Sequence, residues 1–199
     1  MMAELDDGVL WRRAQEGDEA SFGRLFERHA AAIHSYCFRR TGDWSHAEDL
    51  TSATFLESWR HRARVQLDAH EVLPWLYGVA SNLARNRARS RRRYAAAIAR
   101  MPRQPPEDDF SDAATERVAS EQRVKRLLAS LRRLPVGEQE AVALVCWQGL
   151  THREAAFALD VPEATIRTRL FRARQRLAAA AGGVHDSRRV ALREEGGPQ

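Results

Sequence analysis

The segment from Glu163 to Ala181 combines arginines with a narrow apolar stripe at helical spacing. With 3.6 residues per turn, one face carries only apolar side chains, which are Ile166, Leu170, Ala173 and Leu177. Thr168 and Arg172 lie nearly opposite that stripe, and Arg167 and Arg169 flank it. A guanidinium group on an exposed helical face can donate two hydrogen bonds to a guanine edge or to a phosphate. The spacing predicts a helix that buries one side and offers the other to duplex DNA, although a solvated basic face is the simpler interpretation.

Phe171 also lies away from the apolar stripe, where an aromatic ring beside arginines suits contact with a base methyl group or a sugar. A second basic segment follows Trp75 and Tyr77 and has no acidic residue from 85 to 103. Its arginines are Arg85, Arg87, Arg89, Arg91, Arg92, Arg93, Arg100 and Arg103. Rings that stack on unpaired bases, next to cations that hold the backbone, suit single-stranded DNA. For Trp75 and Leu76, burial in the core is the competing interpretation.

Helical periodicity also dominates the elements that must position these residues. A helix from Phe22 through Tyr36 is predicted to end near the Thr41-Gly42-Asp43 turn. Ser45 then opens a second helix, with Glu48 completing a capping box, and its apolar residues lie on two faces. A third helix begins around Leu73-Pro74-Trp75. No run of alternating strand type is evident, so the chain is predicted to be all-α.

The second half of the chain predicts four more helical segments. An apolar face from Val124 to Leu134 is followed by the segment EQEAVALVCWQ, which ends at Gly149. Thr151 and Glu154 form a capping box that opens a short helix, and Asp160-Val161-Pro162 makes a tight turn before the basic helix, predicted to stop at Gly182-Gly183. A short capped helix, a tight turn and a basic helix make the layout of a DNA-binding helix-turn-helix.

The 199 residues are predicted to form two small helical domains joined by a flexible linker. The N-terminal domain spans 1–97, the acidic and proline-containing linker spans 98–120, and the helix-turn-helix domain spans 121–181. The tail, 182–199, is polar and is predicted to be disordered.

The composition excludes collagen-like, disulfide-scaffold and wholly disordered classes, with 44% hydrophobic and 30% charged residues. The formal charge is +5, and almost all of the basic residues are arginine. An acidic N-terminus and the lack of about 18 consecutive apolar residues predict neither a signal peptide nor membrane insertion. Two cysteines in apolar helical surroundings fit a reducing compartment, so a cytoplasmic location is expected.

Motifs of enzymes and metal sites are lacking. His34 and Cys37 are one helical turn apart, but no third and fourth ligands follow at zinc-like spacing. There is no P-loop, no G-x-S-x-G and no H-E-x-x-H. We expect no metal, no cofactor, no small-molecule substrate and no enzymatic activity.

Laid out this way, the sequence resembles the bacterial RNA polymerase sigma factors of the extracytoplasmic-function type, within the sigma-70 family, up to about Ala180. The segment AEDLTSATFLESWR looks like the helix that binds core polymerase. LPWLYGVASNLARNRARSRRR resembles the segment that melts and reads the minus-10 element, and GLTHREAAFALDVPEATIRTRLFRARQRL resembles the minus-35 helix-turn-helix. The resemblance implies an alternative sigma factor that directs promoter-specific transcription initiation.

The resemblance also implies roles for individual residues. The polymerase-docking surface would comprise Asp49, Leu50, Phe55 and Leu56, although Ser52-Ala53 replace the Gln-Glu pair common in the family. Minus-10 DNA would contact Asn82, Arg85, Asn86 and Arg89, with the flipped base entering a specificity loop from Arg62 to Val72. Minus-35 DNA would contact Arg167, Thr168, Arg169, Phe171, Arg172 and Arg174. The implied partners are core RNA polymerase, promoter DNA and an anti-sigma factor.

Two other classes of protein remain open at this point. A stand-alone helix-turn-helix regulator would bind duplex DNA as a dimer on a two-fold site, with half-sites about 34 Å or a multiple of that apart. A protein-interaction module with an incidental basic surface would bind DNA in a salt-dependent way with little sequence preference.

Overall fold

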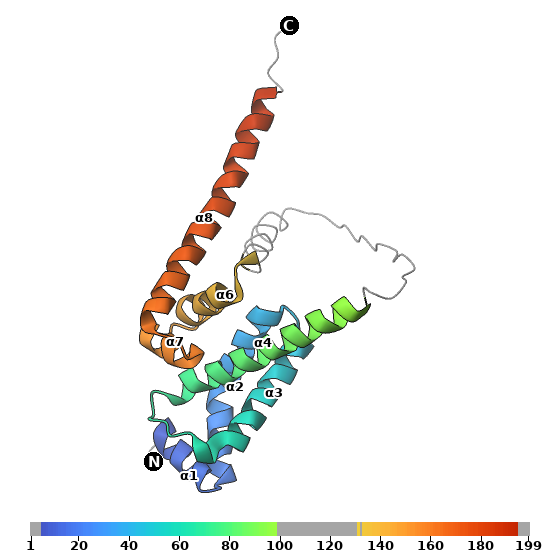
Figure 1. The fold of residues 1–199 in the computed structure, drawn as a ribbon. Helices are drawn as coiled ribbons and strands as arrows, with labels where there is room; N and C mark the ends of the chain where they lie inside the picture. Colours follow the sequence, from blue (N-terminus) through green and yellow to red (C-terminus); the bar gives the residue numbers. More distant parts are fainter. Residues whose placement is uncertain (1–4, 99–130, 132, 195–199) are drawn as a thin grey trace. The chain divides into compact units, whose positions relative to one another are not determined.

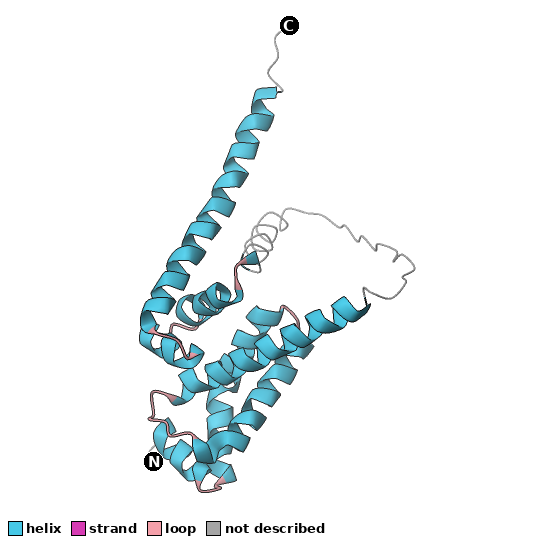
Figure 2. Ribbon diagram, in the orientation of Figure 1, coloured by secondary structure: helices cyan, strands magenta, loops and turns pink. Residues whose placement is uncertain are grey.

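A computed structural model describes residues 5–98, 131 and 133–194 of the chain. The described residues form helices joined by short loops, with no strand among them, as Figure 2 shows. The prediction of an all-α fold is therefore confirmed. Within the same residues, no helix is long and apolar enough to cross a membrane.

The described helices fall into two compact units. The first contains α1 (Asp7–Gln15), α2 (Glu19–Thr41), α3 (Trp44–His61), η1 (Arg62–Arg64) and α4 (Val72–Ile98), as drawn in Figure 1. It also contains the π-helix η2 (Ala143–Trp147), α7 (His152–Leu159) and the first residues of α8 (Glu163–Glu194). The second unit holds α6 (Val136–Val142) and the rest of α8. The predicted domains follow chain order, whereas in the structure η2 and α7 belong with α1 to α4.

Helix ends in the first unit are set by aspartates and by one glycine. Asp18 caps α2 by accepting hydrogen bonds from the main-chain N–H groups of Ala20 and Ser21. Gly42 ends α2 with φ of 69°, a left-handed conformation that glycine adopts without a steric penalty. The predicted end of this helix near Thr41-Gly42-Asp43 is thus confirmed.

The predicted start of the next helix is wrong by two residues. Asp43, and not Ser45, is the N-cap of α3, because its carboxylate accepts from the N–H of His46 at 2.9 Å. Glu48 forms no capping box there; its carboxylate accepts a hydrogen bond from the indole of Trp44 at 2.8 Å. Aspartate and serine are comparable N-caps, so the choice between them depended on where the preceding turn ended.

Large buried side chains from α1, α2 and α4 form the core of the first unit. Trp11, Ile33 and Tyr36 are fully buried, as is Leu76 to within 1%. The ring of Tyr36 meets that of Tyr77 edge to face at 5.3 Å between centroids, and its hydroxyl hydrogen-bonds to that of Ser81 at 2.6 Å. This packing fixes the rotation of α4 about its own axis and so decides which of its residues reach solvent.

The helix-turn-helix forms as predicted. Thr151 and Glu154 make a complete capping box at the start of α7. Asp160 ends α7 in a left-handed conformation, with φ of 50°, and α8 starts after Pro162. The apolar segment before Gly149 is helical as predicted. Residues 143–147 form a π-helix, in which the N–H of Gln148 donates to the main-chain carbonyl of Ala143.

Helix α8 is longer than predicted. It passes through Gly182-Gly183 and continues to Glu194, so the predicted helix end is wrong. A glycine inside a helix costs about 1 kcal/mol relative to alanine, which is too little to end a helix by itself. The linker 98–120, apart from its first residue, most of the Val124–Leu134 segment and the last five residues lie outside the described residues.

Candidate nucleic-acid interface

The predicted minus-10 residues share one face of α4. Asn82, Asn86 and Arg89 are exposed, and Arg85 is half-buried with its guanidinium hydrogen-bonded to the side-chain oxygen of Asn82. Their spacing of three and four residues explains the shared face. Arg87 lies off this face, where it pairs with Asp49 of α3 at 3.1 Å. The structure therefore brings all four predicted residues together as one polar stripe with a basic end.

The aromatic run before this stripe belongs mostly to the core. Leu76 and Tyr77 are buried, while Trp75 is half-buried and packs edge to face against Trp11 at 5.0 Å between centroids. The hydroxyl of Tyr77 donates to the side-chain oxygen of Gln148 at 3.0 Å, and burial raises the pKa of Tyr77 to about 12. Trp75 alone of these rings keeps an accessible surface that a base could contact.

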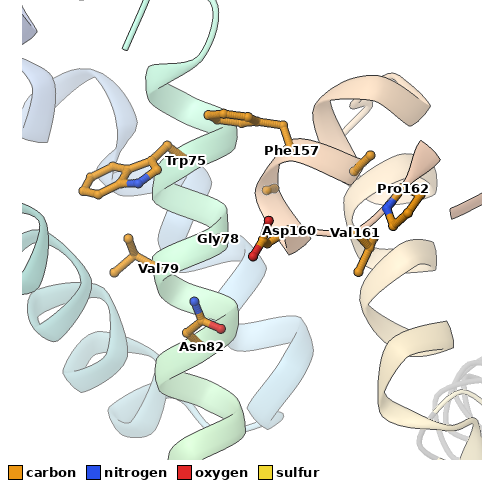
Figure 3. Close-up of a pocket in the computed structure, with 10 residues that line it drawn as sticks. Trp75, Gly78, Val79, Asn82, Phe157, Asp160, Val161 and Pro162 are labelled. Carbon is orange, nitrogen blue, oxygen red and sulfur yellow. The ribbon is translucent and has the colours of Figure 1, made fainter. Parts of the chain in front are cut away.

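A pocket with a volume of about 560 Å³ lies in the first unit between α4 and the end of α7. Trp75, Val79 and Asn82 line it from α4, and Phe157, Asp160 and Pro162 line it from the other side. Figure 3 shows the carboxylate of Asp160 pointing towards α4 near Gly78. Asn82, a predicted DNA-binding residue, thus has the turn of the helix-turn-helix as a neighbour.

Most of the predicted minus-35 residues are exposed on α8. Arg167, Thr168, Phe171, Arg172 and Arg174 all reach the surface, and 60% of Phe171 is accessible. Ile166 and Ala173 are completely buried, which agrees with the predicted apolar stripe. The exposed ring of Phe171, on the same helix as these arginines, is accessible to a ligand.

Arg169 is the exception on this helix. Its guanidinium lies against Gly137 of α6, so closely that a Cβ on that glycine would be 2.9 Å from the Arg169 Cζ. The side chain is half-buried, and its Nη1 atom is buried without a hydrogen-bond partner. Arg176 is also engaged with α6, through a 3.3 Å ion pair with the buried Glu138. In this structure, Arg169 therefore packs within the second unit instead of facing outward.

The predicted polymerase-docking residues separate into two groups. Leu50 and Phe55 are only 3% and 4% exposed, and Phe55 packs edge to face against Phe26 at 4.8 Å. Asp49 and Leu56 are exposed. Leu50 and Phe55 are therefore too buried to contact a partner directly, and Phe55 is covered by the rings of Phe22 and Phe26 of α2. Phe26 of α2, exposed over 44% of its surface and in contact with Phe55, was not among the predicted residues and is a second exposed apolar side chain of this helix pair.

The predicted specificity loop, Arg62 to Val72, contains η1 and an irregular segment. Its main-chain carbonyls are bound by side chains of α1, a helix that carries none of the predicted site residues. Trp11 and Gln15 make these bonds. The sequence before Gly17 has a short amphipathic pattern that could have predicted helix α1. That pattern does not indicate that α1 binds the loop.

The His34 and Cys37 pair shows no metal-binding geometry. Among the described residues, no three histidine, cysteine or acidic side chains are grouped so that they could hold an ion. The ring of His34 packs against Trp44 at 4.6 Å, and burial raises the pKa of the Cys37 thiol to about 11.

The described part of the chain combines helices only, an exposed basic helix and a helix-turn-helix, a combination typical of DNA-binding proteins. The family model for Sigma-70 region 2 matches residues 25–94, and the model for Sigma-70, region 4 matches residues 125–177. The chain belongs to the sigma-70 family and is a sigma factor of the extracytoplasmic-function type. The predicted role in promoter-specific transcription initiation is confirmed, and the stand-alone regulator is not favoured.

Curated relatives support this assignment, and a solved structure shares the fold. The chain is 30% identical to the extracytoplasmic-function sigma factor SigM of Mycobacterium tuberculosis over 90% of this chain and 86% of SigM. It is 31% identical to BldN of Streptomyces coelicolor over 85% of this chain, but spans only 63% of BldN. The fold is similar to that of the sigma factor RpoE in its complex with the anti-sigma factor NepR from Bartonella quintana. That match has a TM-score of 0.61 and 18% identity, over 81% of this chain and 96% of the other.

Proposed function

We propose that this sigma factor docks on core RNA polymerase through α3, captures unpaired minus-10 DNA on α4, and contacts minus-35 duplex DNA through α8. The observation that carries the proposal is the polar stripe of α4, because Asn82, Asn86 and Arg89 are exposed on the same face. Amide groups can hydrogen-bond to base edges while arginine holds phosphates. Unstacking one base costs a few kcal/mol, which these contacts would offset.

The minus-35 contact is supported by the exposed face of α8. Arg167 and Arg172 flank the exposed ring of Phe171, and α8 begins directly after the turn of the helix-turn-helix. A recognition helix of this motif enters the major groove with its N-terminal residues at the base edges. Arg167, Thr168, Phe171 and Arg172 are the residues we assign to base contacts, with Arg174 at the phosphates.

Docking on polymerase is supported by the exposed residues of α3. Asp49 and Leu56 combine a carboxylate with an apolar side chain that is 51% exposed, and Phe26 of α2 adds a second exposed apolar side chain. Leu50 and Phe55 hold the surface in place from the core. Interfaces of this kind depend on a few buried apolar anchors surrounded by polar contacts.

The protein acts by binding and has no chemistry of its own, since nucleotide addition belongs to the polymerase. We assign the polymerase and minus-10 functions to residues 1–97 and the minus-35 function to residues 121–181, with 98–120 as the linker. The site of action is the cytoplasm. An anti-sigma factor is the expected inhibitor, by analogy with the RpoE complex.

Run-off transcription tests the proposal. Core RNA polymerase from the same bacterium is incubated with genomic DNA fragments, with and without the protein. We expect defined transcripts only when the protein is present, and start sites that share two promoter elements. The matched control uses a template in which the upstream promoter element is replaced. Initiation on this template should fall, while the binding of the protein to core polymerase should stay the same.

A different result would identify a different class of protein. If core polymerase neither binds the protein nor gains specific start sites, the sigma-factor role fails. Binding of a dimer to palindromic duplex DNA, measured by gel shift and sedimentation, would then indicate a stand-alone regulator.

A further inference from the structure

The loop from Arg62 to Val72 takes its shape from α1. The indole N–H of Trp11 donates to the main-chain carbonyl of Val65 at 2.9 Å. The side-chain amide of Gln15 donates to the same carbonyl at 2.9 Å and to that of Arg62 at 3.1 Å. Main-chain carbonyl groups in an irregular segment lack the regular hydrogen bonds of a helix or sheet, so they need other hydrogen-bond donors. Two α1 side chains supply them here, from about 50 residues away in sequence.

The contact is reciprocal. The Nε of Arg62 donates to the carbonyl of Ala14, at the end of α1, at 2.9 Å. The Arg62 guanidinium also donates to the main-chain carbonyl of Trp59 at 2.7 Å. It lies over the Trp59 ring, with Cζ 3.5 Å from the ring centroid. Arg62 thereby links the end of α3, the start of the loop and the end of α1.

The other end of the loop is also held by α1. A Cβ on Gly8 would lie 3.0 Å from the main-chain N of Ala69, so the helix and the loop backbone are in close contact. The ring of Trp11 packs against Trp75, which follows the loop in α4. Contacts at residues 62, 65, 69 and 75 leave the loop little freedom to change shape.

Helix α1 is itself fixed to α2. The carboxylate of Asp7 is hydrogen-bonded to His29 at 2.6 Å and to Arg28, and Leu10 and Trp11 are completely buried. A helix anchored in this way can act as a rigid support. The support leaves Gln66, Asp68 and His70 of the loop exposed.

We infer that Trp11 and Gln15 are positioning residues for minus-10 recognition: they hold the Arg62–Val72 loop in the shape that selects the unpaired base. The inference rests on the proposed function, because it assigns base selection to this loop. Neither residue lies in the segment that matches the Sigma-70 region 2 model, which begins at residue 25. Base preference at minus-10 therefore depends on side chains that do not touch DNA.

Two substitutions remove the donors, and of these Gln15→Met better preserves the packing, because Trp11 is completely buried and a smaller ring would leave space there. Gln15→Met has similar length but no N–H, and Trp11→Phe keeps an aromatic ring without the indole donor. Arg12→Ala, on the exposed side of the same helix, is the matched control, because its side chain takes no part in the contacts described above. Hydrogen exchange of each full-length variant reports the loop, and transcription with core polymerase reports base selection on templates that differ only at minus-10.

We expect the loop amides of Gln15→Met to exchange at least about fivefold faster, because the variant loses both hydrogen bonds that Gln15 donates and one alone is worth about that factor, with α2 and α3 unchanged. The ratio of transcription between preferred and other minus-10 bases should fall at least about fivefold, because one mismatched position normally costs that much or more. Trp11→Phe should act in the same direction and Arg12→Ala should match the wild type. Unchanged loop exchange, or an equal decrease on all templates, would overturn the inference. Failure of the wild type to initiate anywhere would instead refute the sigma-factor role, while hydrogen exchange would still test the positioning.

Discussion

Gly78 of α4 faces the main-chain carbonyl of Ala158 in α7, and a Cβ built on Gly78 would lie 2.4 Å from that carbonyl oxygen. Real Cβ atoms essentially never approach another heavy atom more closely than 3.0 Å, so no other residue fits without displacing backbone. The adjacent Tyr77 reinforces the contact through its hydrogen bond to Gln148. The helix that carries the minus-10 stripe is therefore packed directly against α7.

Substitution of Gly78 tests this packing in solution. Gly78→Ala should lower the free energy of unfolding by about 1–3 kcal/mol, the usual cost of overpacking, as measured by urea denaturation. Gly23→Ala is the control, because an added Cβ there meets nothing within 4 Å. In the α2 interior it should raise stability by about 0.5–1 kcal/mol. Equal behaviour of the two variants would show that α4 and α7 are not in contact in solution.

Two arginines of α8 should differ in promoter recognition. Arg172 is exposed, so Arg172→Ala should weaken use of the minus-35 element by about 1–3 kcal/mol if the side chain binds a base bidentately. Arg169→Ala should have a much smaller effect, because that guanidinium packs against Gly137. Run-off transcription on templates with intact and altered minus-35 elements measures both. A larger loss of selectivity in Arg169→Ala would mean that Arg169 leaves α6 on binding DNA.

Substitutions in α3 should separate docking from folding. Leu56→Ala should leave the free energy of unfolding within about 0.5 kcal/mol of the wild type, as is usual for surface changes. It should weaken binding to core polymerase about tenfold if Leu56 is an interface anchor. Phe55→Ala should instead cost about 3–5 kcal/mol of stability, since the ring is buried. Urea denaturation and competition binding to core polymerase distinguish the two effects, and normal docking by Leu56→Ala would remove this residue from the interface.

The two cysteines should differ in reactivity. Cys146 is exposed, so a thiol reagent at pH 8 should modify it rapidly, whereas Cys37 should react only after unfolding. Burial raises the pKa of Cys37 from 9.0 to about 11, and the unfolded thiol ionises first as the pH rises. The contribution of this thiol to stability should thus be complete below pH 9 and be lost between pH 9 and about 11. Rapid modification of the folded Cys146→Ser variant would contradict the buried position of Cys37.

Acid should weaken the cap of α2. Hydrogen bonds from the side chain and the main-chain N–H of Ser21 hold the pKa of Asp18 below its ordinary 3.8. A lowered pKa means that the stabilisation is present above pH 3.8 and is lost as the pH falls through the folded value. Asp18→Asn keeps an acceptor for these N–H groups but cannot titrate, so its melting temperature should decline less steeply below pH 4. If the melting temperatures of the wild type and Asp18→Asn fell equally with pH, this cap would not contribute to the pH dependence of stability.

Local patterns were sufficient for the secondary structure and the class of fold. Caps and turns act over three or four residues, which is why the Thr151–Glu154 capping box and the glycine end of α2 could be predicted. The apolar stripe of α8 followed from helical period alone, and Ile166 and Ala173 are indeed buried. The order of three motifs along the chain was enough to indicate the sigma-70 family, because each motif is a continuous stretch of residues.

Only the tertiary structure decided which side chains of a predicted surface are available. Periodicity assigns residues to a face of a helix, but it does not say which neighbouring helix covers that face. Phe55 was therefore expected at the polymerase and is found beneath Phe26, and Arg169 was expected at DNA and is found against Gly137. The bonds from Trp11 and Gln15 to the loop join residues about 50 positions apart. Such partners are fixed by the packing of whole helices, which short-range sequence patterns do not encode.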